Sequence, residues 1–277
     1  MVPGARRFGS PMNVFTHDNT DLQAARRRAR LMQYGGLLAI VGSVLCSLFF
    51  PFYAALVFFA YPLLFIGLPL WTIGRNRQRQ LVNAPKIKEM ITSELKGLSD
   101  KYSLHHGASV GGRKIGHLLI TPSGIIVISA NEATGPITCT TDRRGDRWQT
   151  RMTLMDRFSG TRQPIGNPSL ELDAATAAVK ALLAGQDKED VPVRGLVVFV
   201  ANPEIEIDAS SYPAVPLNEL RLAVRELQTI MAEERQEGFD AERLLTSEDR
   251  KRLNVALGPA TVTKATQAVT RPASARS

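Results

Sequence analysis

The sequence lacks charge over one long stretch: from Tyr34 to Gly74, forty-one residues pass without an Asp, Glu, Lys, Arg or His. The hydrocarbon layer of a bilayer is about 30 Å thick, and a helix needs roughly 20 apolar residues to cross it. The stretch is therefore long enough for two transmembrane helices. A buried helical pair inside a soluble core is the alternative, but such helices usually keep one polar side.

Proline divides this stretch, because Pro51 lacks an amide donor and disfavours helix at Phe50. We therefore expect crossings at about 34–49 and 52–73, joined around Phe50–Tyr53. A cleaved signal peptide does not fit, since a polar segment comes first and the apolar run is too long. Basic residues flank both ends, with Arg26, Arg27, Arg28 and Arg30 before the run and Arg75, Arg77, Arg79, Lys86 and Lys88 after it. This pattern predicts an integral protein of the inner or plasma membrane, with both termini cytoplasmic.

Cysteine and histidine are scarce, with two Cys and four His in 277 residues. Cys46 and Cys139 form neither a disulfide framework nor a C-x-x-C metal pair, so a reducing compartment fits. His105 and His106 fall in a stretch with the composition of a turn, Leu104–Gly112, whereas His117 falls in an expected strand. None of them has a second His or Cys at the spacing of a metal site.

The net charge of +8 is unevenly distributed, because residues 1–33 carry six Arg and two Asp and so hold +4. A polybasic segment beside an apolar run attracts anionic lipid headgroups, at about 1 kcal/mol per charge. Arg26, Arg27, Arg28 and Arg30 are the residues that we expect to make this contact. The remaining charge is mixed in sign, which gives little support to a dedicated nucleic-acid surface.

The pattern outside the apolar run predicts a basic, flexible tail over 1–33, a cytoplasmic domain over 75–257 and a disordered tail over 258–277. Within the tail, Asp21–Met32 is a basic helical lead-in. In the domain, apolar periodicity predicts helices over Lys86–Leu98, Ser169–Ala184 and Leu217–Glu234, and another that starts at Thr246–Asp249. Strands are expected over Lys114–Ile120, Ile125–Ala130, Pro136–Thr141, Arg147–Met155 and Val193–Ala201. This order predicts an α/β fold with a mixed sheet between helices.

The segment Lys114–Gly135, which reads KIGHLLITPSGIIVISANEATG, resembles the central hairpin of the nuclease-related domain family, usually called NERD. Other features agree in order: a preceding helix with Glu89, a following Trp148, Asn167-Pro168 at a helix start, and the apolar strand Val193–Val200. Together the resemblance covers about residues 84–235. It implies a restriction-endonuclease-like fold and metal-dependent phosphodiester cleavage.

The resemblance also implies a site made of an Asp at the end of one strand and a Glu-x-Lys on the next. Their carboxylates hold Mg²⁺, which activates a water and neutralises the developing charge, while the lysine positions that water. This chain has Gly116 in place of the Asp, and Ser129 and Asn131 in place of the Glu and Lys. Only Glu89 keeps a charge. The sequence therefore predicts no nuclease activity by the family mechanism and no metal or other cofactor.

Other residues offer alternatives that the sequence leaves open. Glu132, Asp142, Asp146 and Asp156 are acidic and near the lost site, but Asp is also common in solvated turns. For binding, His117 is a candidate phosphate donor, Arg113 and Lys114 a basic loop after Gly111-Gly112, and Trp148 a stacking platform between Arg147 and Arg151. Ordinary packing or solvation explains each of them as well.

Three functions are consistent with these observations. The first is a membrane-anchored, catalytically silent nuclease-related domain that binds or scaffolds a partner protein at the cytoplasmic face. The second is an active phosphodiesterase with displaced ligands, and it would need Mg²⁺. The third is an adaptor that holds nucleic acid near the membrane. The loss of all three site charges favours the first.

Overall fold

The computed structural model describes residues 11–17, 21–49, 54–153, 156, 165–201, 203–238 and 245–265. The chain forms two compact units. One contains residues 19–88. The other contains residues 1–18 together with residues 89–277, so the segments on both sides of the apolar run belong to the same domain.

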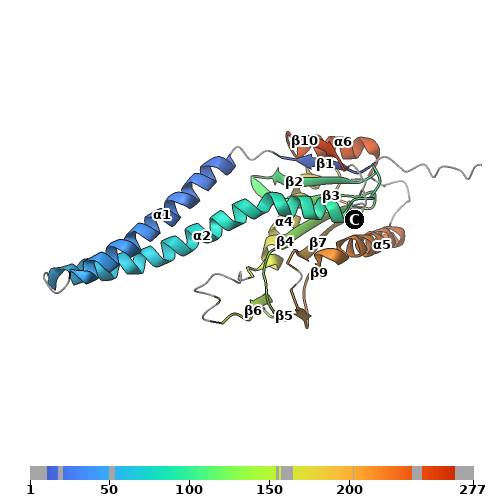
Figure 1. Ribbon diagram of the computed structural model, residues 1–277. Helices are drawn as coiled ribbons and strands as arrows, with labels where there is room; N and C mark the ends of the chain where they lie inside the picture. Colours follow the sequence, from blue (N-terminus) through green and yellow to red (C-terminus); the bar gives the residue numbers. More distant parts are fainter. Residues whose placement is uncertain are drawn as a thin grey trace, which may run out of the picture. The chain divides into compact units, whose positions relative to one another are not determined.

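The first unit is a helical hairpin in which α1 (Asp21–Leu48) and α2 (Val57–Glu94) run side by side, with a short 3₁₀ turn, η1 (Ala54–Leu56), before α2 (Figure 1). Both helices are long and apolar enough to cross a membrane. They extend well beyond the expected 34–49 and 52–73. The basic flanks continue the helices because Arg, Gln and Lys are good helix formers. The expected break at Phe50–Tyr53 lies outside the described residues.

Small residues form the contact between the two helices. Among the side chains described in 21–49 and 54–88, six residues are buried: Ala29, Gly36 and Ser43 on α1, and Ala60, Gly67 and Gly74 on α2. Each is seven positions from the next, the repeat that keeps one seam of a helix facing its partner. The Ser43 hydroxyl donates to the Ala60 carbonyl at 2.8 Å. The small-residue face of α1 therefore contacts α2.

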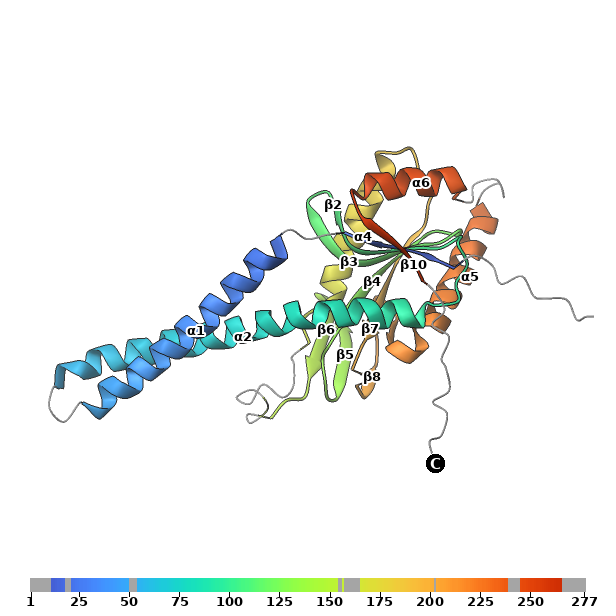
Figure 2. The same cartoon turned by 45° about the horizontal axis from the view of Figure 1, so that its top comes forward.

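The second unit is a domain built on a mixed, seven-stranded sheet (Figure 2). Its strands lie in the order β10 (Thr261–Lys264), β1 (Asn13–Thr16), β2 (Ser103–Val110), β3 (Arg113–Ile120), β4 (Ile125–Asn131), β7 (Val193–Phe199) and β9 (Ala214–Pro216). The β2–β3–β4 strands are antiparallel neighbours, whereas β1 is parallel to β2, and β4, β7 and β9 are parallel. A smaller sheet contains β6 (Gly145–Thr150), β5 (Ile137–Asp142) and β8 (Ile205–Ile207).

Helices cover both faces of the large sheet. Apolar residues of α4 (Pro168–Ala184) and α6 (Ser247–Ala256) share one core with β3, β4 and β7. On β7, Gly195 contacts this side whereas its neighbour Arg194 pairs with Glu234 of α5 (Leu220–Gly238). Because adjacent residues of a strand point to opposite faces, α5 lies on the other side of the sheet. The domain is thus an α/β sandwich, as expected.

Three expectations about local structure were wrong. The expected flexible tail, 1–33, contains β1, whereas the helical lead-in expected within it at Asp21–Met32 is confirmed as the start of α1; the expected tail 258–277 contains β10. The stretch Leu104–Gly112 is no turn, because most of it belongs to β2. β1 and β10 are each four residues long and form through pairing with segments distant in sequence: Val14 lies opposite both Leu104 and Thr263. Such pairing leaves no local periodicity for the sequence to reveal.

Candidate functional site

The positions of the lost charges lie together at the ends of two neighbouring strands. His117 on β3 is opposite Ile128 on β4, and Gly116 and Ser129 are the next residues along those strands. Gly116 is solvent-exposed, and a side-chain carbon added there would meet no atom within 4 Å. The fold therefore brings the predicted positions Gly116 and Ser129 close together, with room for a side chain at Gly116.

The side chains at the two remaining positions are uncharged and make hydrogen bonds within the domain. The Ser129 hydroxyl donates to a Glu171 carboxylate oxygen at 3.4 Å. The Asn131 side-chain oxygen accepts from the Ala133 amide at 2.8 Å, a local turn that ends β4. Glu89, on α2, is solvent-exposed. Among the described residues, no group of three or more His, Cys, Asp or Glu side chains has the geometry to hold a metal ion.

Asp146 is buried and serves the fold. Its carboxylate accepts hydrogen bonds from the Ser169 hydroxyl at 2.6 Å, the Thr141 hydroxyl at 2.7 Å, and the Ser211 amide and hydroxyl at 2.9 and 3.0 Å. Burial raises the pKa of Asp146, but the hydrogen bonds from these three residues outweigh it, and the pKa is lowered overall. The carboxylate thus joins the β5–β6 hairpin to α4 and to the loop before β9. The solvated-turn interpretation of Asp146 was wrong.

One comparison with known proteins gives a result. Residues 86–200 match the model of the nuclease-related domain family, NERD. The chain carries a nuclease-related domain. The matched range holds Glu89, Gly116, Ser129 and Asn131, and the mixed sheet flanked by helices is the restriction-endonuclease-like fold of that family. No match was found among curated proteins or solved structures.

Trp148 of the nuclease-related domain is no stacking platform, which corrects one of the binding expectations. The indole is only 8% exposed and packs against Phe199, with ring centroids 5.9 Å apart. Its Nε1–H donates to the Ser169 hydroxyl at 2.8 Å. Core packing and this buried hydrogen bond account for the residue.

His117 is also buried, so it cannot serve as a phosphate donor in this structure. Its Nδ1 lies 2.7 Å from Nδ1 of His106, directly opposite on β2. Arg113 and Lys114 are exposed, after a turn in which Gly111 and Gly112 have φ values of 56° and 77°. Arg113 and Lys114 begin β3 and so form no loop, but they remain the accessible part of the predicted binding set.

Sequence reasoning missed a second histidine pair. His17 follows β1, and its Nε2 lies 3.2 Å from Nδ1 of the fully buried His105. The His105 ring stacks on Phe15, with centroids 4.4 Å apart. Burial lowers the pKa of His105 to about 4, against a hydrogen bond with Asn254 that raises it, while the charge of His17 lowers it further. The pair escaped notice because both β1 and β2 were assigned to irregular structure.

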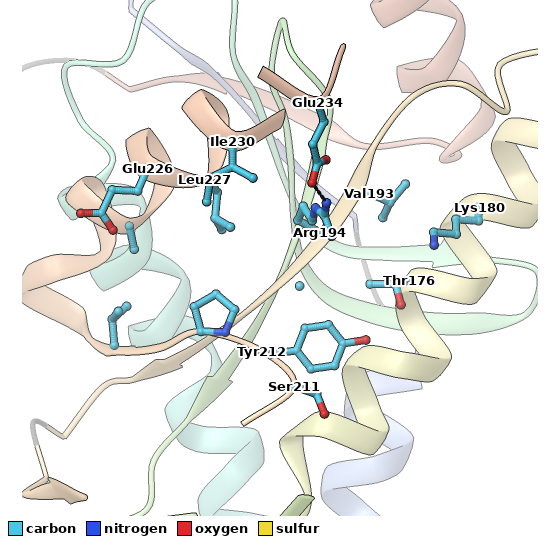
Figure 3. Close-up of a pocket in the computed structure, with 14 residues that line it drawn as sticks. Thr176, Lys180, Val193, Arg194, Ser211, Tyr212, Glu226, Leu227, Ile230 and Glu234 are labelled. Atoms are coloured by element: carbon cyan, nitrogen blue, oxygen red, sulfur yellow. Dashed lines mark hydrogen bonds and ion pairs between the residues drawn. The ribbon is translucent and has the colours of Figure 1, made fainter. Parts of the chain in front are cut away.

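A cavity of about 650 Å³ lies between α4, β7 and α5 (Figure 3). The Tyr212 ring covers the β7 backbone at Gly195, and the tyrosine hydroxyl donates to Asp173 at 2.6 Å. At the other side of the cavity Arg194 pairs with Glu234. The charged side chains that line the cavity are of both signs, and two of them, Arg194 and Glu234, pair with each other. The cavity contains none of the positions that the family's chemistry uses.

Proposed function

We propose that this protein is a membrane-anchored nuclease-related domain without the family's metal-dependent chemistry, acting as a binding or scaffolding module at the cytoplasmic face. The observation that carries the proposal is the exposure of the hairpin. In the most apolar windows of α1 and α2, only 11% and 17% of residues are buried. A core helix of a soluble protein would be mostly buried, so these side chains need a nonpolar environment from outside the chain.

The strand order supports a hairpin whose two ends lie on the same side of the membrane. β1 precedes α1 and β2 follows α2, yet these two strands are hydrogen-bonded neighbours in one sheet. If the chain emerged from α2 on the opposite side of the membrane from β1, the two strands could not pair. Together with the basic residues at both ends, this pairing favours the cytoplasmic side for the domain and for the segments before and after the hairpin.

Anionic lipid is the first proposed partner. Arg26, Arg27, Arg28 and Arg30 on α1 and the basic residues from Arg75 onward on α2 flank the two ends of the apolar run. Trp71 lies one turn before Arg75, with its ring 5.2 Å from the guanidinium carbon. An aromatic ring followed by cations is typical of the headgroup region. A protein partner is the second proposal, with the exposed Arg113 and Lys114 as its candidate contacts.

The proposal that the protein lacks metal-dependent nuclease activity rests on the types of residue at the candidate site. Gly116 has no side chain, and Ser129 and Asn131 carry no charge, so Glu89 alone cannot replace the paired carboxylates that Mg²⁺ needs. Asp146, the nearest buried carboxylate on the β5–β6 hairpin, already accepts its hydrogen bonds from the protein. The buried Trp148 removes the main argument for a nucleic-acid adaptor.

Alkaline carbonate extraction of cell membranes tests the anchor. The full-length protein should stay with the membrane pellet. Placing charge at two exposed positions of the hairpin, with Leu38→Glu and Phe65→Glu, should release it. Leu170→Glu, at a similarly exposed position of α4, is the matched control and should change nothing. Release of the unaltered protein would rule out an integral anchor.

Incubation of the detergent-solubilised protein with linear DNA and Mg²⁺ or Mn²⁺ tests the silent site. No cleavage is expected. A variant with Gly116→Asp, Ser129→Glu and Asn131→Lys should bind Mn²⁺, measured by electron paramagnetic resonance, because it restores the paired carboxylates and a side chain at Gly116 meets no atom within 4 Å. Cleavage by the unaltered protein that is lost in Glu89→Gln would show an active enzyme instead.

A further inference from the structure

Strand β7 has an edge that its neighbour covers only in part. β9 pairs with the last residues of β7, from Val197 to Phe199. Among the described residues, the earlier part of β7, Val193–Leu196, has a strand partner on one side only, which is β4. Pro213 comes directly before β9 and has no amide hydrogen, so it cannot donate to the next carbonyl along that edge of β7. The ladder between the two strands therefore stops short of Gly195.

The backbone groups of Val193 and Gly195 point to this uncovered edge. Successive residues of a strand direct their N–H and C=O groups to opposite sides. The Pro192 carbonyl accepts from the first amide of β4 at 2.9 Å, whereas the Val197 amide donates to the residue before β9 at 3.0 Å. Odd-numbered residues of β7 therefore face away from β4. Val193 and Gly195 are both buried, and buried backbone groups are nearly always paired in folded proteins, so this edge has the character of a site for another chain.

The space beside this edge is the cavity of about 650 Å³ between α4 and α5 (Figure 3). Residues of α4 line one wall, residues of α5 line the other, and Val193–Gly195 of β7 lie between them. An additional strand placed there would continue the line of β9 and would be covered by a helix on each face. Cavities of about 300–1,000 Å³ are the usual size of ligand sites in proteins. The uncovered edge is thus enclosed enough to exclude a second sheet and wide enough for one extended chain.

The wall formed by α5 is apolar next to the strand. Leu227 and Ile230 line it, and Glu226 lies farther out on the same helix (Figure 3). Arg194 points to this face, where it pairs with Glu234. Side chains directly opposite each other on paired strands share a face of the sheet. The residue of an added strand opposite Arg194 would therefore meet Leu227 and Ile230, and an apolar side chain fits there.

The wall formed by α4 has a positive charge at one end. Val193 and Gly195 point to this face, because adjacent residues of a strand alternate. The Tyr212 ring covers Gly195, so only a small side chain fits beside that residue. At the other end of this wall, Lys180 is solvent-exposed and lies near Val193 (Figure 3). An acidic side chain opposite Val193 would complement the charge of Lys180.

We propose that this cavity binds an extended peptide of a partner protein, which adds to β7 as a further strand. Backbone donors and acceptors that alternate along an edge are matched by another backbone, and pockets for alternate side chains give such sites their specificity. The peptide pairs with Val193 and Gly195, places an apolar residue against Leu227 and Ile230, and directs an acidic neighbour toward Lys180.

This peptide site goes beyond the proposed function. The cavity contains neither the candidate site at Gly116 and Ser129 nor any residue of the helical hairpin. Peptide binding would therefore hold whether or not the hairpin crosses a membrane, and whether or not the domain cleaves DNA. Carbonate extraction and the metal assays do not involve the cavity, so a failure of the peptide site is distinguishable from a failure of the anchor or of the silent site.

Fluorescence anisotropy of labelled peptides with the full-length protein in detergent tests the site. The probes are the capped pentapeptide Thr-Glu-Leu-Ser-Thr and the same residues in reverse order, so that one of them fits whichever way the added strand runs. One of the two should bind saturably. Binding of neither would overturn the proposal, including the case in which a second copy or another segment of the same chain fills the cavity.

Methylation of single peptide amides tests whether the peptide adds as a strand. Alternate amides of an extended chain face β7, so N-methylation of either the Glu or the Leu amide should abolish binding, and methylation of the other should change the affinity by less than about twofold. Loss with the Leu amide indicates a parallel strand, and loss with the Glu amide an antiparallel one. Equal effects of the two methylations would contradict strand addition.

Substitutions on the two walls locate the peptide. Lys180→Glu should weaken binding by about two- to fivefold, and a peptide with Lys in place of Glu should bind this variant better than the unaltered protein. Ile230→Glu, at a position 44% exposed, should abolish binding. Leu222→Glu, at a position 57% exposed on the same helix and outside the cavity, is the matched control and should have no effect. Unchanged binding to Ile230→Glu, or no gain from the charge exchange at Lys180, would place the peptide elsewhere and overturn the proposal.

Discussion

At the scale of residues, the domain has no charged side chain at Gly116, Ser129 and Asn131 of the candidate site, but it has a buried carboxylate, Asp146, that stabilises the fold. The three positions that would hold a metal and its water are neutral, and one of them is a glycine in open space. By contrast, the buried carboxylate of Asp146 has hydrogen bonds from four different side chains and one backbone amide. Charge has been kept where it joins structural elements and is missing where it would activate water.

Asp146→Asn should destabilise the domain by about 2–4 kcal/mol, because the Ser211 amide and the serine hydroxyls would face an amide that accepts fewer hydrogen bonds. Urea unfolding monitored by Trp148 fluorescence measures this change. Asp142→Asn on the same hairpin is the control. Among the described residues, Asp142 accepts a hydrogen bond from the Arg144 amide and forms a long ion pair with Arg147 at 3.7 Å, so its loss should cost below about 1 kcal/mol.

Two glycines of the central hairpin differ in how much room they have. A side-chain carbon at Gly124 would lie 2.5 Å from the Pro192 carbonyl oxygen and 2.9 Å from the Met231 sulfur, whereas one at Gly116 would meet nothing within 4 Å. Gly124→Ala should therefore cost about 1–3 kcal/mol of stability, and Gly116→Ala should leave it nearly unchanged. Equal melting temperatures for the two variants would contradict this packing.

At the scale of elements, the sequence predicted what local pattern determines. β3, β4, α4 and β7 begin within one residue of their expected starts, and the Asn167 cap with Pro168 at the first helical position is confirmed. The helix start expected at Thr246–Asp249 is confirmed as well, and the structure adds a capping box between these two residues. The sequence did not reveal β1, β10 or the histidine pairs. Four-residue strands carry too few residues to show a period, and their partners are distant in sequence.

The place of the candidate site was predictable and its surroundings were not. Gly116, Ser129 and Asn131 stand on two apolar strands whose pattern is strong, so their proximity followed from the sequence. The burial of Trp148 and His117 depended on α4 and on β2, which come from elsewhere in the chain. Whether a side chain is exposed depends on how the helices and the sheet pack together. For this reason the binding roles predicted for Trp148 and His117 were wrong.

The seam between α1 and α2 yields a prediction at this scale. A side-chain carbon at Gly36 would lie 2.4 Å from the Trp71 amide nitrogen, whereas one at Gly35 would only touch the Leu70 side chain at 3.9 Å. Gly36→Leu should separate the helices and lower the thermal stability of the helical signal in detergent, measured by circular dichroism. Gly35→Leu, one residue away, is the matched control and should keep the hairpin stable.

At the scale of the whole molecule, the ends of the chain complete the domain. A fragment of residues 75–257 lacks β1 and β10 and leaves the edge of β2 open. Open edges favour aggregation, so this fragment should be poorly soluble. A chain in which a flexible linker of about 15 residues replaces 21–88 keeps both strands and spans about 22 Å, and it should stay monomeric. Size-exclusion chromatography of the two proteins makes the comparison.

The insertion of the hairpin between two paired strands has a consequence for biosynthesis. β1 leaves the ribosome before α1, but its partner β2 is made only after α2 is complete. The sheet therefore cannot be completed before the hairpin is made, and under the proposed membrane anchor it would close only when both ends of the hairpin lie in one compartment. A chain inserted with its first residues across the bilayer would lack β1 in its domain and leave a bare edge for quality control to recognise. Under the proposed membrane anchor, correct topology and correct folding would therefore depend on the same pair of strands.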